Sequence, residues 1–127
     1  MQVFKTKVFR RFQRKERMND ASLVEAITRA EQGLVDVDLG HGLIKQRIAR
    51  SGAGKSGGFR TIIAYRRGDR AVFLYGFAKS ARGNITADDL TDLAETGTAL
   101  MALSQRDVGR MVEEETLFEV KDDEDDN

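Results

Sequence analysis

The chain has 127 residues, of which 33% are charged and 40% hydrophobic, and it contains no cysteine. This length suits a single domain with one core, and the missing thiols exclude disulfides, thiol catalysis and cysteine-based zinc sites. No stretch reaches the roughly 18 apolar residues that cross a membrane, and the basic N-terminus lacks the apolar segment of a signal peptide. The composition predicts a soluble, cytoplasmic protein without a membrane partner.

Positive and negative charges are separated along the chain, although its formal net charge is zero at pH 7. Residues 1–82 carry 18 Lys and Arg against 7 Asp and Glu, a balance of +11. Residues 83–127 carry 3 against 14, a balance of −11. A basic body with an acidic end is typical of a protein that binds a polyanion, nucleic acid first among them. The alternative is a solvated surface whose two halves neutralise each other in the fold.

The first third of the chain predicts a short strand and two helices. Alternation over residues 1–7 predicts the strand, and apolar residues at helical spacing from Val8 onward predict a helix with a basic outer face. The second helix is predicted to begin with a capping box of Ser22 and Glu25 and to end at Gly33. Because the link between the helices is short, we expect them to form an αα-hairpin.

The middle of the chain predicts the sheet. Residues 35–39 should form a loop or a weak edge, and residues 43–49 a strand, with a helix as the alternative. Residues 51–58 (SGAGKSGG) are glycine-rich and predict a loop. Residues 61–65 and 71–77 predict a β-hairpin joined by the cationic turn RRGDR. Because both runs are continuously apolar, we expect them at the centre of the sheet.

The last third predicts one long helix and an extension. Thr86 and Asp89 form a predicted capping box for a helix over residues 87–103. Residues 105–120 predict a C-terminal extension with a further helical turn and a short strand, and residues 121–127 a disordered acidic tail. The predicted fold is α+β, in the order β-α-α-β-β-β-α within residues 1–104. Two N-terminal helices and a C-terminal helix would pack on about four antiparallel strands.

Three polar features in this pattern bear on function. Residues 54–57 (GKSG) resemble the end of a phosphate-binding P-loop. However, Ala49 stands where that motif needs glycine, and the segment is followed by a predicted strand where a P-loop is followed by a helix. A glycine-rich loop that carries a lysine can instead close over a nucleic-acid backbone. His41 is the one histidine and is predicted to be an exposed loop residue rather than a metal ligand. Arg60 opens an apolar strand, so it is either paired with a carboxylate or part of a site.

Two stretches around the hairpin resemble a known family. Residues 54–61 read GKSGGFRT and residues 73–80 read FLYGFAKS, with Tyr65 ending the first hairpin strand. The pattern has a lysine-bearing loop, a Ser-Gly-aromatic-Arg start to one strand, and an apolar strand ending in Gly-Phe-x-Lys before a helix. It is similar to the RelE/HigB family of toxins from bacterial type II toxin–antitoxin systems. The similarity covers residues 3–100.

This resemblance implies a toxin that cleaves mRNA on the ribosome, without a metal or a cofactor, and so inhibits translation. It also implies a partner, an antitoxin protein with a DNA-binding segment, that holds the toxin inactive. In the implied reaction the 2′-OH of the RNA attacks the adjacent phosphate. Such a step needs a base for the 2′-OH, an acid for the leaving oxygen and cations on the phosphate.

The resemblance also implies the site residues. Arg60 matches the arginine that stabilises the phosphate, Lys55 matches the basic loop, and Lys79 matches the basic segment after the last strand, so we expect these three to be catalytic. The residues expected to bind RNA phosphates are Arg66, Arg67 and Arg82. Because Arg60 opens one hairpin strand and Lys79 ends its antiparallel partner, the two should lie at one end of the sheet.

The chain departs from the family pattern after its last predicted hairpin strand. Well-studied members carry a Tyr or His there, and residues 80–89 contain neither. The acid–base residue is therefore unassigned, and two alternatives stay open. One is a ParE-like inhibitor that binds DNA gyrase without enzymatic activity, and the other is a nucleic-acid-binding module without catalysis.

Truncation after Val120 tests whether the acidic end competes with nucleic acid for the basic body. The polyanion at residues 122–126 is tethered to a body of +11 charge, so it can occupy the cationic surface at high effective concentration. We expect truncation to tighten RNA binding at low salt, with the difference fading as salt rises. Fluorescence anisotropy over a salt series measures this effect, and an unchanged salt profile would leave the tail as an aid to solubility.

Overall fold

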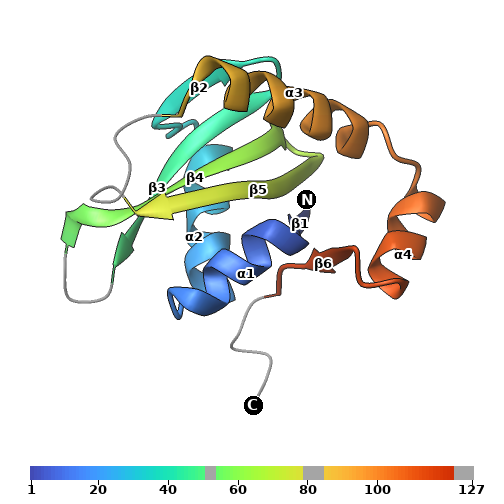
Figure 1. Ribbon diagram of the computed structural model, residues 1–127, viewed down its shortest axis with the longest axis horizontal. Helices are drawn as coiled ribbons and strands as arrows, with labels where there is room; N and C mark the ends of the chain where they lie inside the picture. Colours follow the sequence, from blue (N-terminus) through green and yellow to red (C-terminus); the bar gives the residue numbers. More distant parts are fainter. Residues whose placement is uncertain (51–53, 79–84, 122–127) are drawn as a thin grey trace.

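A computed structural model describes residues 1–50, 54–78 and 85–121, with the backbone alone at residues 50 and 54–57. The predicted acidic residues 122–127 lie outside this range. In chain order the elements are β1 (Gln2–Thr6), α1 (Lys7–Lys15), α2 (Asp20–Glu31), β2 (Val37–Gly40), β3 (Leu43–Arg50), β4 (Gly54–Arg66), β5 (Arg70–Ala78), α3 (Ala87–Met101), α4 (Gln105–Glu113) and β6 (Leu117–Glu119) (Figure 1).

Six described strands form one mixed sheet in the order β2-β3-β4-β5-β1-β6. Strands β2 to β5 pair antiparallel, whereas β1 runs parallel to β5, and β6 pairs antiparallel with β1. The fold is α+β as predicted. The prediction of about four antiparallel strands was wrong in both the number of strands and their arrangement. The terminal strands pair across most of the chain length, and the partner of such a strand is not encoded in its own residues.

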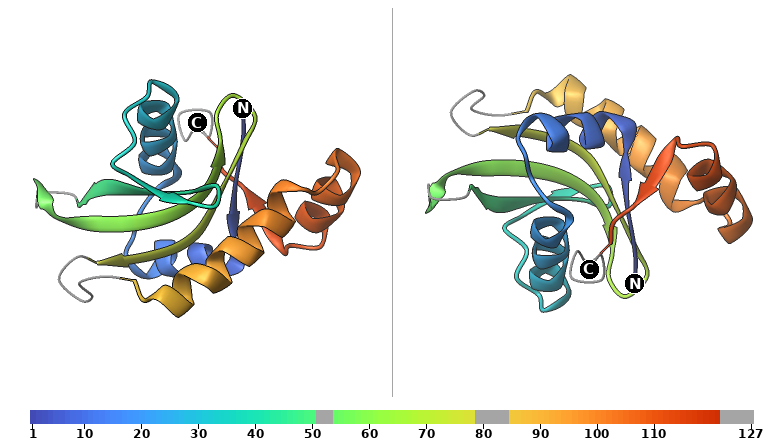
Figure 2. Two further views of the ribbon diagram at one scale, coloured as in Figure 1. Left: turned by 90° about the horizontal axis from the view of Figure 1, so that it is seen from above. Right: turned by 90° about the horizontal axis from the view of Figure 1, so that it is seen from below.

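Helices cover both faces of the sheet, with α2 on one side of strands β3 to β5 and α3 on the other (Figure 2). Phe9 of α1 shares a core cluster with the buried side chains of α2 and with Phe59 and Ile63 of β4. Ile62 and Ala64, which alternate with them, belong to the cluster beneath α3. The central position predicted for the hairpin is confirmed, since β4 and β5 occupy the middle of the sheet.

Capping residues set the helix ends. Helix α2 begins at Asp20 because the Asn19 side chain accepts a hydrogen bond from the backbone N–H of Ser22, at 3.0 Å. The predicted capping box of Ser22 and Glu25 was therefore wrong, and Glu25 instead pairs with Arg29 one turn later. The predicted end at Gly33 is confirmed by its φ of +86°. The capping box of α3, formed by Thr86 and Asp89, is also present.

The loop predicted over residues 51–58 was wrong for residues 54–58, because β4 already begins at Gly54, and residues 51–53 lie outside the described residues. Gly58 is buried between β4 and its neighbour β3, and a Cβ added to it would lie 2.2 Å from the backbone oxygen of Ile48. At this position glycine therefore allows two strands to approach closely, and it does not mark a turn.

Replacing Gly58 with alanine should lower the free energy of unfolding by about 1–3 kcal/mol, because the new methyl group meets a backbone oxygen that a side-chain rotation cannot move. Gly109 in α4 is the matched control, since a Cβ there would have nothing within 4 Å. Gly109→Ala should stabilise the protein by about 0.5–1 kcal/mol, as expected at a helix interior. Urea unfolding measures both variants, and an equal response would refute the steric account of Gly58.

A buried polar network joins both ends of the described chain. The Lys5 ammonium of β1 donates to Gln13 of α1 and to the Asp20 carboxylate of α2, each at 2.7 Å. Asp20 also accepts from the Gln13 side chain at 2.7 Å and from the backbone N–H of Lys121 at 3.1 Å. Burial raises the pKa of Asp20, but the hydrogen bonds from these three residues and the charge of Lys5 outweigh it, so the pKa lies below its usual value.

Asp20→Asn should destabilise the protein by about 2 kcal/mol at neutral pH, because the buried Lys5 ammonium loses its counter-charge. The folded-state pKa of Asp20 is depressed, so its contribution is present above the ordinary pKa of 3.8 and is lost as pH falls through the folded value. Urea unfolding at neutral pH and over an acid series should show wild type and variant converging below that range. Asp69→Asn, at an exposed ion pair, should cost under about 1 kcal/mol.

Candidate functional site

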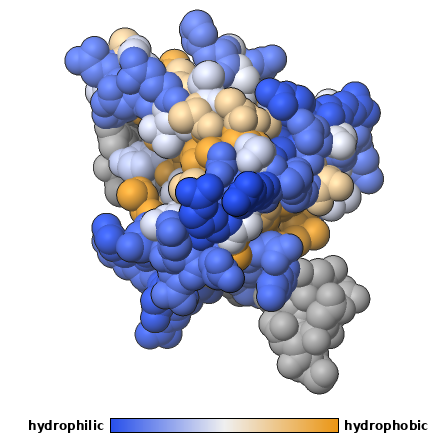
Figure 3. All heavy atoms as spheres, turned by 90° about the vertical axis from the view of Figure 1, so that its right-hand side faces the viewer, coloured by the Kyte–Doolittle hydropathy of each residue, from blue (hydrophilic) through white to orange (hydrophobic). Residues whose placement is uncertain are grey.

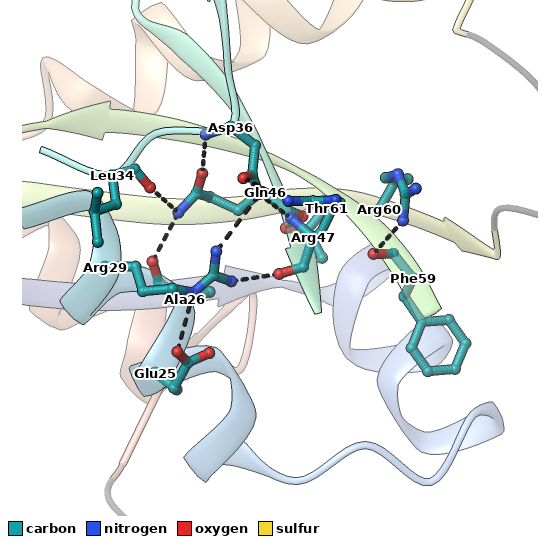
Figure 4. Close-up of polar contacts among 10 residues, drawn as sticks. All are labelled: Glu25, Ala26, Arg29, Leu34, Asp36, Gln46, Arg47, Phe59, Arg60 and Thr61. Carbon is teal, nitrogen blue, oxygen red and sulfur yellow. Dashed lines mark hydrogen bonds and ion pairs between the residues drawn. The ribbon is translucent and has the colours of Figure 1, made fainter. Parts of the chain in front are cut away.

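The open end of the β4–β5 hairpin carries Arg60. Phe59 pairs with Ala78 and Arg60 with Phe77, so the start of β4 lies beside the end of β5. The Phe59 ring packs 5.6 Å from the ring of Phe12 in α1. Because neighbouring residues of a strand face opposite sides, the Arg60 side chain points to the other face, which carries α3 (Figure 4).

Arg60 has no carboxylate partner within the part of the chain that the structure describes. Its guanidinium makes one long hydrogen bond of 3.4 Å, to the backbone oxygen of Phe59. Four other arginines reach a carboxylate within 3.5 Å: Arg29, Arg47, Arg66 and Arg110. The sequence left two alternatives for Arg60, pairing with a carboxylate or membership of a functional site, and the described contacts favour a functional site.

Strand register places two more cations on the face of Arg60. Arg47 lies directly opposite Arg60 on β3, and Lys45 lies opposite Ile62. Residues directly opposite on antiparallel strands share a face, so Lys45, Arg47 and Arg60 form what we name the cationic sheet face. Sequence reasoning missed Lys45 and Arg47. The available signal was their alternation with the apolar residues of the strand, but their meaning depends on a register that residues 43–49 do not encode.

The buried amide of Gln46 anchors β3 in that register (Figure 4). Its side chain is fully buried and donates to the backbone oxygens of Ala26 at 3.0 Å and Leu34 at 3.3 Å, while accepting from the backbone N–H of Asp36 at 2.7 Å. The Thr61 hydroxyl of β4 then donates to the Gln46 backbone oxygen at 2.9 Å. These bonds connect α2, the segment before β2, and two strands, and so hold the residues next to Gln46 and Thr61 in place.

Asp36 is the carboxylate nearest to the cationic sheet face among the described contacts. It accepts from the backbone N–H of Arg47 at 2.7 Å and lies 3.5 Å from the guanidinium groups of Arg47 and Arg29. Burial raises the pKa of Asp36, but the hydrogen bonds from Arg47 and the positive charges of Arg47 and Arg29 outweigh this effect. The pKa of Asp36 therefore lies below its usual value. Asp36 stays ionised and holds Arg47 at the margin of the face without a short ion pair.

The turn arginines lie at the opposite end of the hairpin. Arg66 pairs with Arg70 across the turn, six positions along β4 from Arg60, or about 20 Å at the rise of a strand. Arg66 binds the Asp69 carboxylate at 3.0 Å, and Arg67 donates to the backbone oxygen of Glu31 at 2.8 Å. The structure therefore does not bring these two residues together with Arg60, and their role in RNA binding stays a prediction.

The remaining predicted residues are only partly described. Lys55 belongs to β4, but its side chain lies outside the described part of the structure. Lys79 and Arg82 lie outside the described residues. Since Ala78 pairs with Phe59, the backbone reaches Lys79 at the end of the sheet where Arg60 lies, but convergence of these side chains stays a prediction.

The sequence placed Arg70 in the cationic turn RRGDR, but Arg70 is the first residue of β5. Its side chain is buried and donates to the backbone oxygens of Leu100 at 2.9 Å and Leu103 at 3.0 Å. These carbonyls lie at the C-terminal end of α3, where helical carbonyls lack partners and the helix dipole favours a cation. Arg70 thus fixes α3 to the sheet and is not available to RNA.

The two tyrosines lie on opposite faces of the sheet. Tyr65 donates its hydroxyl to the Glu31 carboxylate, and burial together with this bond raises the pKa of Tyr65 to about 12. It is therefore protonated at neutral pH and joins β4 to α2. Tyr75 pairs with Ile62, so it shares the face of Arg60. It lines a cavity of about 160 Å³ with residues from the start of α3, namely Ile85, Asp89, Asp92 and Leu93.

A larger apolar groove of about 770 Å³ runs along α3 beside the exposed turn residue His41. Its walls include Leu90, Ala94 and Thr98. Hydrophobic surface bordered by hydrophilic residues is visible on the side of the molecule drawn in Figure 3. Within the described residues, no three His, Asp or Glu side chains gather as a metal site, and none of the described helices is long and apolar enough to span a membrane.

In a comparison with protein-family models, residues 1–120 match the RelE toxin of the RelE/RelB toxin–antitoxin system. The match extends past the hairpin and α3 through α4 and β6. It therefore includes residues 105–120, which the motifs of the hairpin do not cover. A comparison with curated protein sequences finds no match.

Proposed function

The chain belongs to the RelE family of toxins from toxin–antitoxin systems, and from this membership we propose that it is an endoribonuclease that cleaves mRNA on the ribosome and inhibits translation. We propose the cytoplasm as its place of action and a metal-independent reaction as its chemistry. Membership in the family also implies a cognate antitoxin as a partner. That this antitoxin carries a DNA-binding segment is part of the proposal.

The observation that carries the proposal is the guanidinium of Arg60 on the cationic sheet face, which has no carboxylate partner among the described residues. When the RNA 2′-oxygen bonds to phosphorus and the bond to the 5′-oxygen breaks, negative charge grows on the non-bridging phosphate oxygens. A guanidinium held by the sheet without a carboxylate partner can donate to two of these oxygens. Arg47 and Lys45 add positive charge to the same face, which supports binding of the neighbouring phosphates.

The reaction also moves two protons: the attacking 2′-OH releases one to solvent water, and the leaving 5′-oxygen gains one. Arg60 cannot supply the second because a guanidinium stays protonated. Tyr75 is two residues from Phe77, the partner of Arg60, and its side chain lies on the same face. A phenol at this position can give its proton to the leaving 5′-oxygen. We therefore propose Tyr75 as the acid, in place of the Tyr or His missing from residues 80–89.

Arg60→Ala should slow RNA cleavage about 100-fold or more, the scale of losing one group that stabilises transition-state charge. Tyr75→Phe should slow cleavage while leaving RNA affinity unchanged, since it removes only the hydroxyl. Purified protein is assayed for transcript cleavage on translating ribosomes, alongside growth arrest on expression. Arg110→Ala is the matched control, because Arg110 is exposed on α4 and paired with Asp107, and it should cleave like wild type.

The same experiment separates the alternatives. Intact transcripts combined with failing DNA supercoiling would replace the nuclease with a gyrase inhibitor of the ParE type. Growth arrest and cleavage that persist unchanged in Arg60→Ala would refute the role of the cationic sheet face. Nucleic-acid binding with neither growth arrest nor cleavage would leave a binding module without catalysis.

A further inference from the structure

We propose that the outer face of α1 is a docking surface for the backbone of double-helical RNA, such as a helix of ribosomal RNA. The surface consists of Lys7, Arg10, Arg11 and Arg14, which we name the α1 ridge. This inference rests on the proposed function in one respect, because an RNA target is what makes a second RNA-binding surface useful. It assigns residues that lie apart from the cationic sheet face.

Helical spacing puts the four cations on one side of α1. They occupy positions i, i+3, i+4 and i+7, which form a single stripe on a helix, and together they line a shallow groove of about 350 Å³. The other side of α1 packs inward, since Phe9 and Gln13 are buried and Phe12 contacts Phe59. The helix therefore packs Phe9, Phe12 and Gln13 inward and presents the four ridge cations outward, beside the exposed side chain of Val8.

Unlike several other arginines that the structure describes, the ridge cations have no carboxylate partner among the described residues. Lys7, Arg11 and Arg14 make no side-chain hydrogen bond or ion pair within the described residues, and α1 itself contains no acidic residue (KVFRRFQRK). Arg10 lies over the Phe118 ring of β6, 4.2 Å from its centroid, which leaves its N–H groups without a carboxylate. Like charges one turn apart destabilise a helix, so four cations without a carboxylate partner among the described residues carry a cost that a bound polyanion would remove.

The chemistry of the ridge favours an RNA duplex over a single strand. Proteins bind single strands by stacking bases on exposed aromatic rings. The aromatic rings of α1 face the core, and Phe118 is covered by Arg10. A row of cations without stacking rings matches the phosphates of a duplex, whose bases are already stacked on each other.

The fold separates the ridge from the Arg60 site but connects the two rigidly. Phe12 of α1 packs on Phe59, and the next residue, Arg60, points to the opposite face of β4. A duplex bound at the ridge and a cleaved strand at Arg60 would therefore occupy different sides of the sheet. Docking of the ridge on structured RNA would orient the Arg60 face toward its substrate without competing with it.

The test neutralises three ridge cations in one variant, Lys7→Gln/Arg11→Gln/Arg14→Gln, and spares Arg10 because it packs on Phe118. The matched control carries Arg106→Gln/Arg110→Gln/Lys121→Gln, which removes the same charge from the C-terminal part of the chain. Binding of a short RNA duplex is followed by fluorescence anisotropy over a salt series. The logarithm of the affinity falls linearly with the logarithm of the salt concentration, and each lost phosphate contact reduces the magnitude of this slope by about 0.9. The slope of the ridge variant should therefore be smaller by about 2.7, and its affinity at low salt should be at least about tenfold weaker. The control should keep the wild-type slope.

Further measurements separate a specific loss of duplex binding from unfolding and from other binding defects. Circular dichroism should show both variants folded, and an unfolded triple variant is replaced by Arg14→Gln, with an expected slope loss of about 0.9. Equal slopes for ridge and control variants would overturn the proposal. The proposal would also be overturned if the ridge variant lost as much affinity for single-stranded poly(U) as for the duplex, or if it lost antitoxin binding while its affinity for the duplex stayed intact. Transcript cleavage by the wild-type protein is measured alongside, because its absence together with a lowered salt slope in the ridge variant would refute the nuclease and leave the ridge standing.

Discussion

The register of β4 between β3 and β5 is the constraint on which the rest of the site depends. Side chains alternate faces along a strand, so a slip of one residue would turn Arg60 toward α1 and turn Phe59 away from Phe12 to the opposite face. The buried Gln46 amide ties β3 to α2, and the Thr61 hydroxyl ties β4 to β3. Gly58 permits the close approach of these strands at Ile48. Residues outside the cationic sheet face thus decide where its cations point.

The cations of the basic half divide into two groups with different roles. One group is used inside the fold: Lys5 binds Asp20 in a buried network, and Arg70 caps the carbonyl end of α3. The other group, on α1 and on the cationic sheet face, has few or no carboxylate partners among the described residues. The excess of positive charge in the sequence therefore overstates the charge offered to nucleic acid, but the remainder is concentrated on two surfaces.

The C-terminal part of the chain contributes to the same body. Strand β6 pairs with β1, and the backbone of Lys121 donates to Asp20 at the start of α2. Phe118 of β6 also lies beneath the Arg10 guanidinium of α1. The segment after α3 thus supports both the buried network and the surface of α1, which agrees with a family match that runs through residue 120.

The sequence by itself determined the local features. Hydrophobic periodicity, caps and apolar runs located α2, α3, the central hairpin and the α+β class, because each depends on neighbouring residues. The motif around Arg60 indicated the family from contiguous residues. Only the tertiary structure decided the order of the six strands, the burial of Arg70 and the strand at Gly54–Gly58. It also placed Arg47 and Lys45 on the same face of the sheet as Arg60. These depend on which distant segments pair and in what register, and that choice is made by the core as a whole.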